Sequence, residues 1–83
     1  MNPEESKKYE EEVAALSFEE SMSQLERLVE RLETGGADLN ESLDIYEKAV
    51  VLRNHCKAVL DDGQRRIKKI IESSGGITES DFQ

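Results

Sequence analysis

The sequence predicts an all-α protein: an antiparallel, coiled-coil-like hairpin of two helices, with a longer second helix and flexible termini. Three observations predict this fold. Between Phe18 and Leu32, apolar residues recur every three or four positions, which is the period of a helix and not of a strand. The pair Gly35-Gly36 interrupts this pattern, as a turn between helices does. The chain then holds neither proline nor glycine from Asp38 to Asp62, so a second helix can run without a break.

The first helix is expected over residues 17–34. Ser17 and Glu20 form the pattern of a capping box, in which each side chain satisfies the other residue's free backbone amide. The glycine pair ends the helix. Its apolar face is expected to pack inside the hairpin and comprises Phe18, Met22, Leu25, Val29 and Leu32.

The second helix is expected over residues 38–72. Asp38 and Glu41 repeat the capping pattern at its start. Gly63 leaves two interpretations open, because it either ends the helix as a cap or lies inside it at a cost of ~1 kcal/mol relative to alanine. Two acidic residues before it each precede an arginine by four positions: Asp61 before Arg65, and Asp62 before Arg66. Such pairs favour continuation by a few tenths of a kcal/mol each, so we expect the helix to continue.

The expected lengths of the two helices differ by almost a factor of two. At ~1.5 Å per residue the first spans ~27 Å and the second ~50 Å. The short connection over residues 35–37 requires antiparallel packing, so the first helix covers only the first half of the second. We expect the acidic residues 1–16 and the Ser/Gly-rich residues 73–83 to be flexible.

The second helix carries two apolar stripes. The "short stripe" is expected to pack on the first helix and comprises Leu39, Leu43, Tyr46 and Val50. The "long stripe" starts with the 4-3-4-3-4 spacing of a coiled-coil seam and comprises Ile45, Ala49, Leu52, Cys56, Val59, Gly63, Ile67 and Ile70. A two-helix hairpin has no third layer to cover it, so we expect the long stripe to bind a partner and the isolated chain to self-associate. In the alternative, both stripes form one broad internal face.

The charge of the chain argues against independent binding to nucleic acid. It holds 19 acidic and 11 basic residues, a net charge of −8, and phosphate repels such a chain. One local exception is the "basic patch", which comprises Arg65, Arg66, Lys68 and Lys69. The patch has no neighbouring aromatic residue on which bases could stack, and the helix dipole also favours basic residues near a C-terminus. Whether the patch contacts DNA, an acidic partner or only solvent stays open.

Catalytic and metal-binding patterns are lacking in the sequence. His55 and Cys56 are the only residues of their types, and adjacent positions on a helix point in different directions, so they form no metal pair. Glu26 and Glu30 share a face but lack a third ligand. A lone cysteine excludes a disulfide framework and fits the reducing cytoplasm, and no apolar run is long enough for a membrane span. We therefore expect no catalytic, metal or cofactor-binding residue.

A resemblance rests on three features between residues 17 and 70. They are the hairpin loop, the Leu39-Asn40-Glu41-Ser42-Leu43 start of the second helix, and a cysteine ten residues after Tyr46. In this combination the sequence resembles the small subunits of exodeoxyribonuclease VII. The resemblance implies a non-catalytic helical hairpin that binds a larger catalytic subunit. It also implies that the complex degrades single-stranded DNA from either end to oligonucleotides without needing a divalent metal, and that this chain reaches DNA only through the complex.

Two positions depart from that family pattern. Ala49 stands where many members have glycine, and Gly63 where many have alanine. Both exchange one small residue for another, so they bear on packing and helix continuity. Two other classes of function compete with this one: a generic coiled-coil adaptor or self-assembling hairpin unrelated to a nuclease, and a small DNA-binding module that uses the basic patch. Co-purification of a nuclease large subunit would separate the family function from the adaptor.

Overall fold

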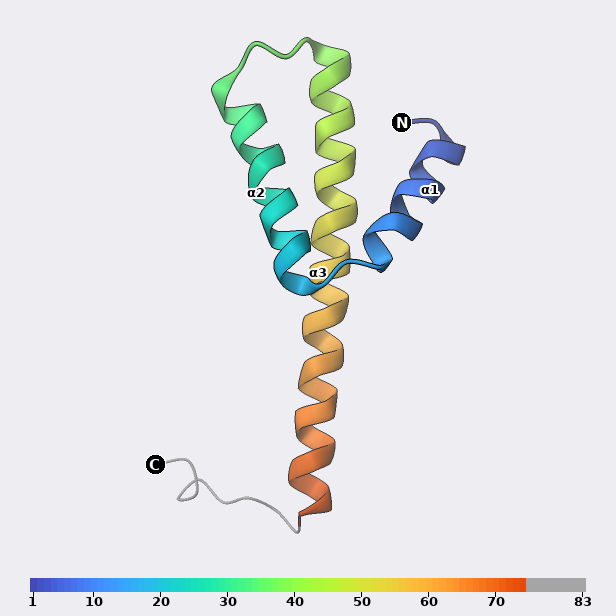
Figure 1. Cartoon of the computed structure of the whole chain (residues 1–83), viewed down its shortest axis with the longest axis vertical. Helices are drawn as coiled ribbons and strands as arrows, with labels where there is room; N and C mark the ends of the chain where they lie inside the picture. The colour runs from blue at the N-terminus through green and yellow to red at the C-terminus, as the bar shows by residue number, and fades with distance from the viewer. Residues whose placement is uncertain (75–83) are drawn as a thin grey trace.

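The computed structural model describes residues 1–74 and shows three helices, with no strand among these residues (Figure 1). They are α1 (Pro3–Ala14), α2 (Phe18–Thr34) and α3 (Leu39–Ser73). The extents of the molecule are 55 × 28 × 15 Å, and its length is that of α3, whose 35 residues span about 52 Å at ~1.5 Å per residue. The predicted all-α class is confirmed, with three helices in place of two. Of the tail expected to be flexible, residues 75–83 lie outside the described residues.

The start and end of α2 follow from local chemistry. The Ser17 hydroxyl accepts a hydrogen bond from the Glu20 backbone amide at 3.1 Å, and the Glu20 carboxylate accepts one from the Ser17 amide at 3.2 Å. At the other end, Gly35 and Gly36 have φ angles of 74° and 84°. L side chains rarely adopt this left-handed region, so the glycine pair both ends α2 and permits the reversal into α3.

The long helix α3 passes through Gly63 without interruption and ends at Ser73. The Asp38 carboxylate caps its start by accepting a hydrogen bond from the Glu41 amide at 2.8 Å. Around Gly63, Asp62 forms ion pairs with Arg65 at 3.6 Å and Arg66 at 2.9 Å. The expected pair between Asp61 and Arg65 is replaced by the one from Asp62.

The N-terminal segment expected to be flexible is the helix α1. Asn2 caps it by accepting a hydrogen bond from the Glu5 amide at 2.8 Å, and Pro3 occupies the first helical position, where its missing N–H is not needed. Val13 is buried, with 1% of its surface exposed, because α1 packs against α3. The acidic composition of this segment hid a helix that the Asn-Pro-Glu-Glu start would have indicated.

Both shorter helices pack on the first half of α3, as Figure 1 shows with α2 and α1 on its two sides. The last residue of α3 to be buried is Cys56. Beyond it, residues 57–73 extend past the other helices and form what we call the overhang. The buried residues are Val13, Ser21, Ile45, Leu52 and Cys56.

In the first half of α3, which the other helices cover, the two stripes exchange the places predicted from the sequence. Members of the long stripe form the core, since Ile45, Leu52 and Cys56 are at most 8% exposed. In the short stripe, expected inside the hairpin, Leu39 is 75% exposed and Tyr46 is 61% exposed. The physical reason is continuity. The long stripe stays apolar or small for eight positions, whereas the short stripe meets two basic residues after Val50, so packing α2 on the long stripe buries more apolar surface.

Candidate interaction surfaces

The described residues contain no cluster that suggests catalysis. Within residues 1–74, no group of three or more histidine, cysteine, aspartate or glutamate side chains could hold a metal ion. Among these same residues, no helix has the length and apolar character needed to cross a membrane. His55 is half-buried, and its Nε2 donates a hydrogen bond to the Leu16 carbonyl at 2.9 Å. It therefore fixes the connection between α1 and α2 onto α3.

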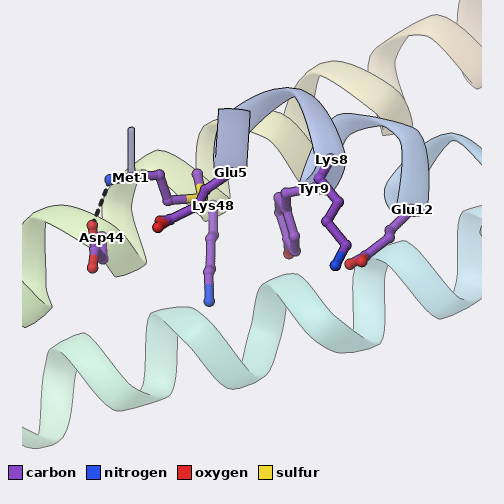
Figure 2. Close-up of a pocket in the computed structure, with 7 residues that line it drawn as sticks. All are labelled: Met1, Glu5, Lys8, Tyr9, Glu12, Asp44 and Lys48. Atoms are coloured by element: carbon purple, nitrogen blue, oxygen red, sulfur yellow. Dashed lines mark hydrogen bonds and ion pairs between the residues drawn. The ribbon is translucent and has the colours of Figure 1, made fainter. Parts of the chain in front are cut away.

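A hollow of about 270 Å³ lies between α1 and α3 (Figure 2). Charged groups dominate its lining, which comprises Met1, Glu5, Lys8, Tyr9, Glu12, Asp44 and Lys48. The Met1 ammonium donates to Asp44 at 2.6 Å and to Glu47 at 2.7 Å, and Lys48 Nζ lies 5.6 Å from the centre of the Tyr9 ring. Burial raises the pKa of Tyr9. The Met1 ion pairs and the Lys48–Tyr9 contact cross between the two helices, so these residues hold α1 on α3.

The amino-terminal ion pairs predict an alkaline loss of stability. The hydrogen bonds that the Met1 ammonium donates to the Asp44 and Glu47 carboxylates raise the pKa of the Met1 amino group from 8.0 to about 10. A raised pKa stabilises the folded chain fully below pH 8, and that contribution disappears as the pH rises through 10. The melting temperature of a chain beginning at Met1 should therefore fall between pH 8 and 10. The double variant Asp44→Asn with Glu47→Gln should show a flatter profile in this range, and equal slopes would contradict the assignment.

The short stripe forms an exposed apolar surface on the first half of α3. Leu43 is 50% exposed and Val50 is half-buried, in addition to the exposed Leu39 and Tyr46. On α2, Val29 is 40% exposed. The other predicted packing residues of α2 are half-buried: Phe18, Met22, Leu25 and Leu32. This side of the hairpin is thus not covered by any part of residues 1–74.

The overhang presents the second exposed surface, where the long stripe loses its cover. Exposure rises from 5% at Cys56 to 37% at Val59 and 63% at Ile70. Gly63 and, within the hairpin, Ala49 are half-buried, and Ile67 is 59% exposed. The basic patch lies on the same segment and is exposed. Arg65 and Arg66 pair with Asp62, whereas Lys68 and Lys69 make no ion pair within residues 1–74.

These features define a class of protein: a small helical hairpin with exposed apolar surfaces and, in residues 1–74, no metal-binding cluster, which is typical of a subunit that acts through partners. Comparison with known protein families identifies the family. Residues 18–69 match the family described as "Exonuclease VII small subunit", so the chain belongs to this family. The match covers α2, the loop and most of α3, and excludes α1.

Individual members of the family match this chain over most of their length. The exodeoxyribonuclease 7 small subunit of Caulobacter vibrioides is 46% identical over 65 residues, which cover 78% of this chain and 77% of the relative. That of Novosphingobium aromaticivorans is 48% identical over 65 residues and 78% of each chain. That of Bartonella henselae is 44% identical over 68 residues, 82% of this chain and 81% of the relative. No solved structure matches this chain.

Proposed function

We propose that this chain is the non-catalytic small subunit of a cytoplasmic exodeoxyribonuclease VII. In this role it binds the large catalytic subunit, and the complex degrades single-stranded DNA to oligonucleotides from both ends. Membership of the family supports the subunit role. The composition of the chain supports a non-catalytic role beside a catalytic large subunit. Its one half-buried histidine and one buried cysteine do not form a pair of nucleophile and general base.

One observation carries the choice of surface for the large subunit. The long stripe is buried as far as Cys56 and then continues along the overhang at 37–63% exposure. An apolar stripe that leaves its own hairpin in this way favours a second protein as its cover. We therefore assign the large subunit to Val59, Gly63 and Ile70. The other predicted interface residues lie inside the hairpin core or, like Ile67, at the edge of this stripe.

The basic patch fits an acidic surface beside that apolar contact better than DNA. The whole chain carries a net charge of −8, which repels the phosphate backbone. Two of the four basic side chains of the patch, Arg65 and Arg66, are already paired with Asp62. Within residues 1–74, Lys68 and Lys69 are then the side chains of the patch that form no ion pair and can meet an acidic partner.

The test is a pull-down with an exonuclease VII large subunit from the same organism, followed by digestion of single-stranded DNA. The isolated chain should show no nuclease activity, with or without magnesium, and the complex should be active. Val59→Glu should reduce large-subunit binding at least tenfold, because a carboxylate is desolvated in an apolar contact without compensation. Its circular dichroism should be unchanged, since Val59 is 37% exposed.

Ala58→Glu is the matched control. Ala58 is exposed on the overhang but lies about 100° around the helix from Val59, so this variant should bind normally. Failure of the parent chain to bind any large subunit would refute the proposed function. Normal binding by Val59→Glu would refute the surface assignment alone.

A further inference from the structure

The exposed short stripe continues along the whole of α3 with heptad spacing. From Leu39 to Ile71 the positions alternate by four and three residues, and we call this series the outer seam. It comprises Leu39, Leu43, Tyr46, Val50, Arg53, Lys57, Leu60, Gln64, Ile67 and Ile71. Val50 and Ile71 are half-buried, and the other eight residues are exposed. At ~1.5 Å per residue the seam is about 48 Å long, and seven of its ten residues are apolar, as in an unpaired coiled-coil strand.

We propose that two copies of this chain pair in antiparallel orientation along the outer seam, with Leu39 of each copy opposite Ile71 of the other. In this register the apolar residues of one half meet those of the other. Leu43 faces Ile67, and Val50 faces Leu60. Every apolar seam residue except Tyr46, which meets Gln64, is thus covered by an apolar residue of the second copy.

The charges of α3 select the antiparallel direction. Residues 38–47 hold four acidic and no basic side chains, whereas residues 63–72 hold four basic and one acidic. Antiparallel pairing sets these opposite charges against each other at both ends of the dimer. Parallel pairing would set like against like, within the ~8 Å range over which charges interact at physiological salt.

The lengths of the two halves agree with this arrangement. The covered half of α3, residues 39–56, and the overhang, residues 57–73, span about 27 and 26 Å at ~1.5 Å per residue. Each overhang therefore lies along the covered half of the other copy, and neither extends unpaired. At the centre of the dimer, Arg53 of one copy faces Lys57 of the other. Asp61 follows Lys57 by one helical turn in the same copy. Such a polar layer fixes the register of a coiled coil while lowering its stability.

Charge changes at position 40 should have opposite effects on dimer affinity in the antiparallel and the parallel orientation. Asn40 and Lys68 each follow a seam residue by one position and are exposed, and antiparallel pairing brings Asn40 of each copy beside Lys68 of the other. Asn40→Asp should tighten the dimer about two- to tenfold, because it creates two exposed ion pairs. Asn40→Lys should weaken the dimer, and adding Lys68→Glu to it should restore binding. In a parallel dimer, position 40 would lie at the same end as the acidic residues of the other copy, so Asn40→Asp would weaken association.

Sedimentation equilibrium on the isolated full chain measures these dissociation constants, so the test is independent of large-subunit binding. The charge-matched control is Ser23→Asp on α2. Ser23 is exposed and lies outside the seam, so this variant should not tighten the dimer. Circular dichroism checks that each variant keeps its helix content.

Cysteine crosslinking tests the same register without changing charge. In a Cys56→Ala background, Leu43→Cys and Ile67→Cys are prepared as separate single-cysteine chains. Mixed under oxidising conditions, they should crosslink to each other, whereas neither should crosslink to itself, since two Leu43 positions lie about 36 Å apart in the antiparallel dimer. Efficient crosslinking of either variant alone would overturn the proposal. A chain that stays monomeric at high micromolar concentration, and pairs along this seam only with its large subunit, would overturn it as well.

Discussion

Leu52→Glu is expected to unfold the chain. Leu52 is fully buried, with 0% of its surface exposed, at the centre of the part of α3 that the other helices cover. Removing such a side chain alone costs roughly 2–5 kcal/mol, and burying an unpaired carboxylate adds a further desolvation penalty. Small domains have a free energy of unfolding of only about 5–15 kcal/mol. The far-UV circular dichroism of this variant should therefore show little helix at room temperature.

Leu39→Glu is the matched control on the same helix. Leu39 is 75% exposed, and its side chain has few contacts to lose, so the melting temperature of the monomer should change by no more than a few degrees. The sequence interpretation gives the opposite result for Leu52, namely intact helices and lost partner binding. A folded Leu52→Glu chain would restore that interpretation and contradict the buried core described above.

The parts of this fold that sequence could predict are those that local chemistry determines. The capping box of α2 needs only Ser17 and Glu20, and the stop needs only the two glycines with positive φ. Continuation through Gly63 was decided by small local terms, a glycine penalty against ion pairs, and the helix does run on. Each of these depends on residues within one or two turns of one another.

The choice between the two stripes could not be made locally. Both have helical spacing, and which one faces inward depends on two neighbouring helices at once. The acidic composition of residues 1–16 predicts flexibility, so α1 is not recognised from sequence, nor are the burial of Val13 and the hydrogen bond of His55. The same omission made the short stripe appear to be the natural contact for α2. It also left Leu60 and Ile71 unassigned, although Leu60 follows Tyr46 by 14 residues and Ile71 follows Val50 by 21, both multiples of seven.

For the functional surfaces, the class of protein was predictable from the sequence, whereas the position of the partner surface was predictable only in part. The excess apolar surface and the lack of a catalytic pattern indicated a subunit that acts through partners, and the family match is to a small subunit. The need for a partner was inferred from excess apolar surface on α3, which the structure retains. Its location was predictable only in part, because Ile45, Leu52 and Cys56 of the long stripe close the hairpin, whereas Val59 and Ile70 of the same stripe stay exposed.

Val13→Asp is expected to detach α1 and leave the α2–α3 hairpin folded. Val13 is the buried residue of α1, and polar contacts also hold this segment on α3: the Met1 ion pairs, the Lys48–Tyr9 contact and the His55 hydrogen bond. A free helix of 12 residues is marginal in water, so α1 should unfold once its anchor is charged. The family match begins at residue 18, which is consistent with a hairpin that folds without α1.

The expected signal is a loss of about a fifth of the helical circular dichroism, because α1 supplies 12 helical residues beside the 17 of α2 and the 35 of α3. Amide exchange should become fast in residues 3–14 and stay slow around Leu52. Ala14→Asp, at the exposed neighbouring position, should leave the α1 signal unchanged. If Val13→Asp instead abolishes the whole cooperative transition, α1 is part of the core on which the hairpin depends, because α2 alone then covers too little of α3 to keep it folded.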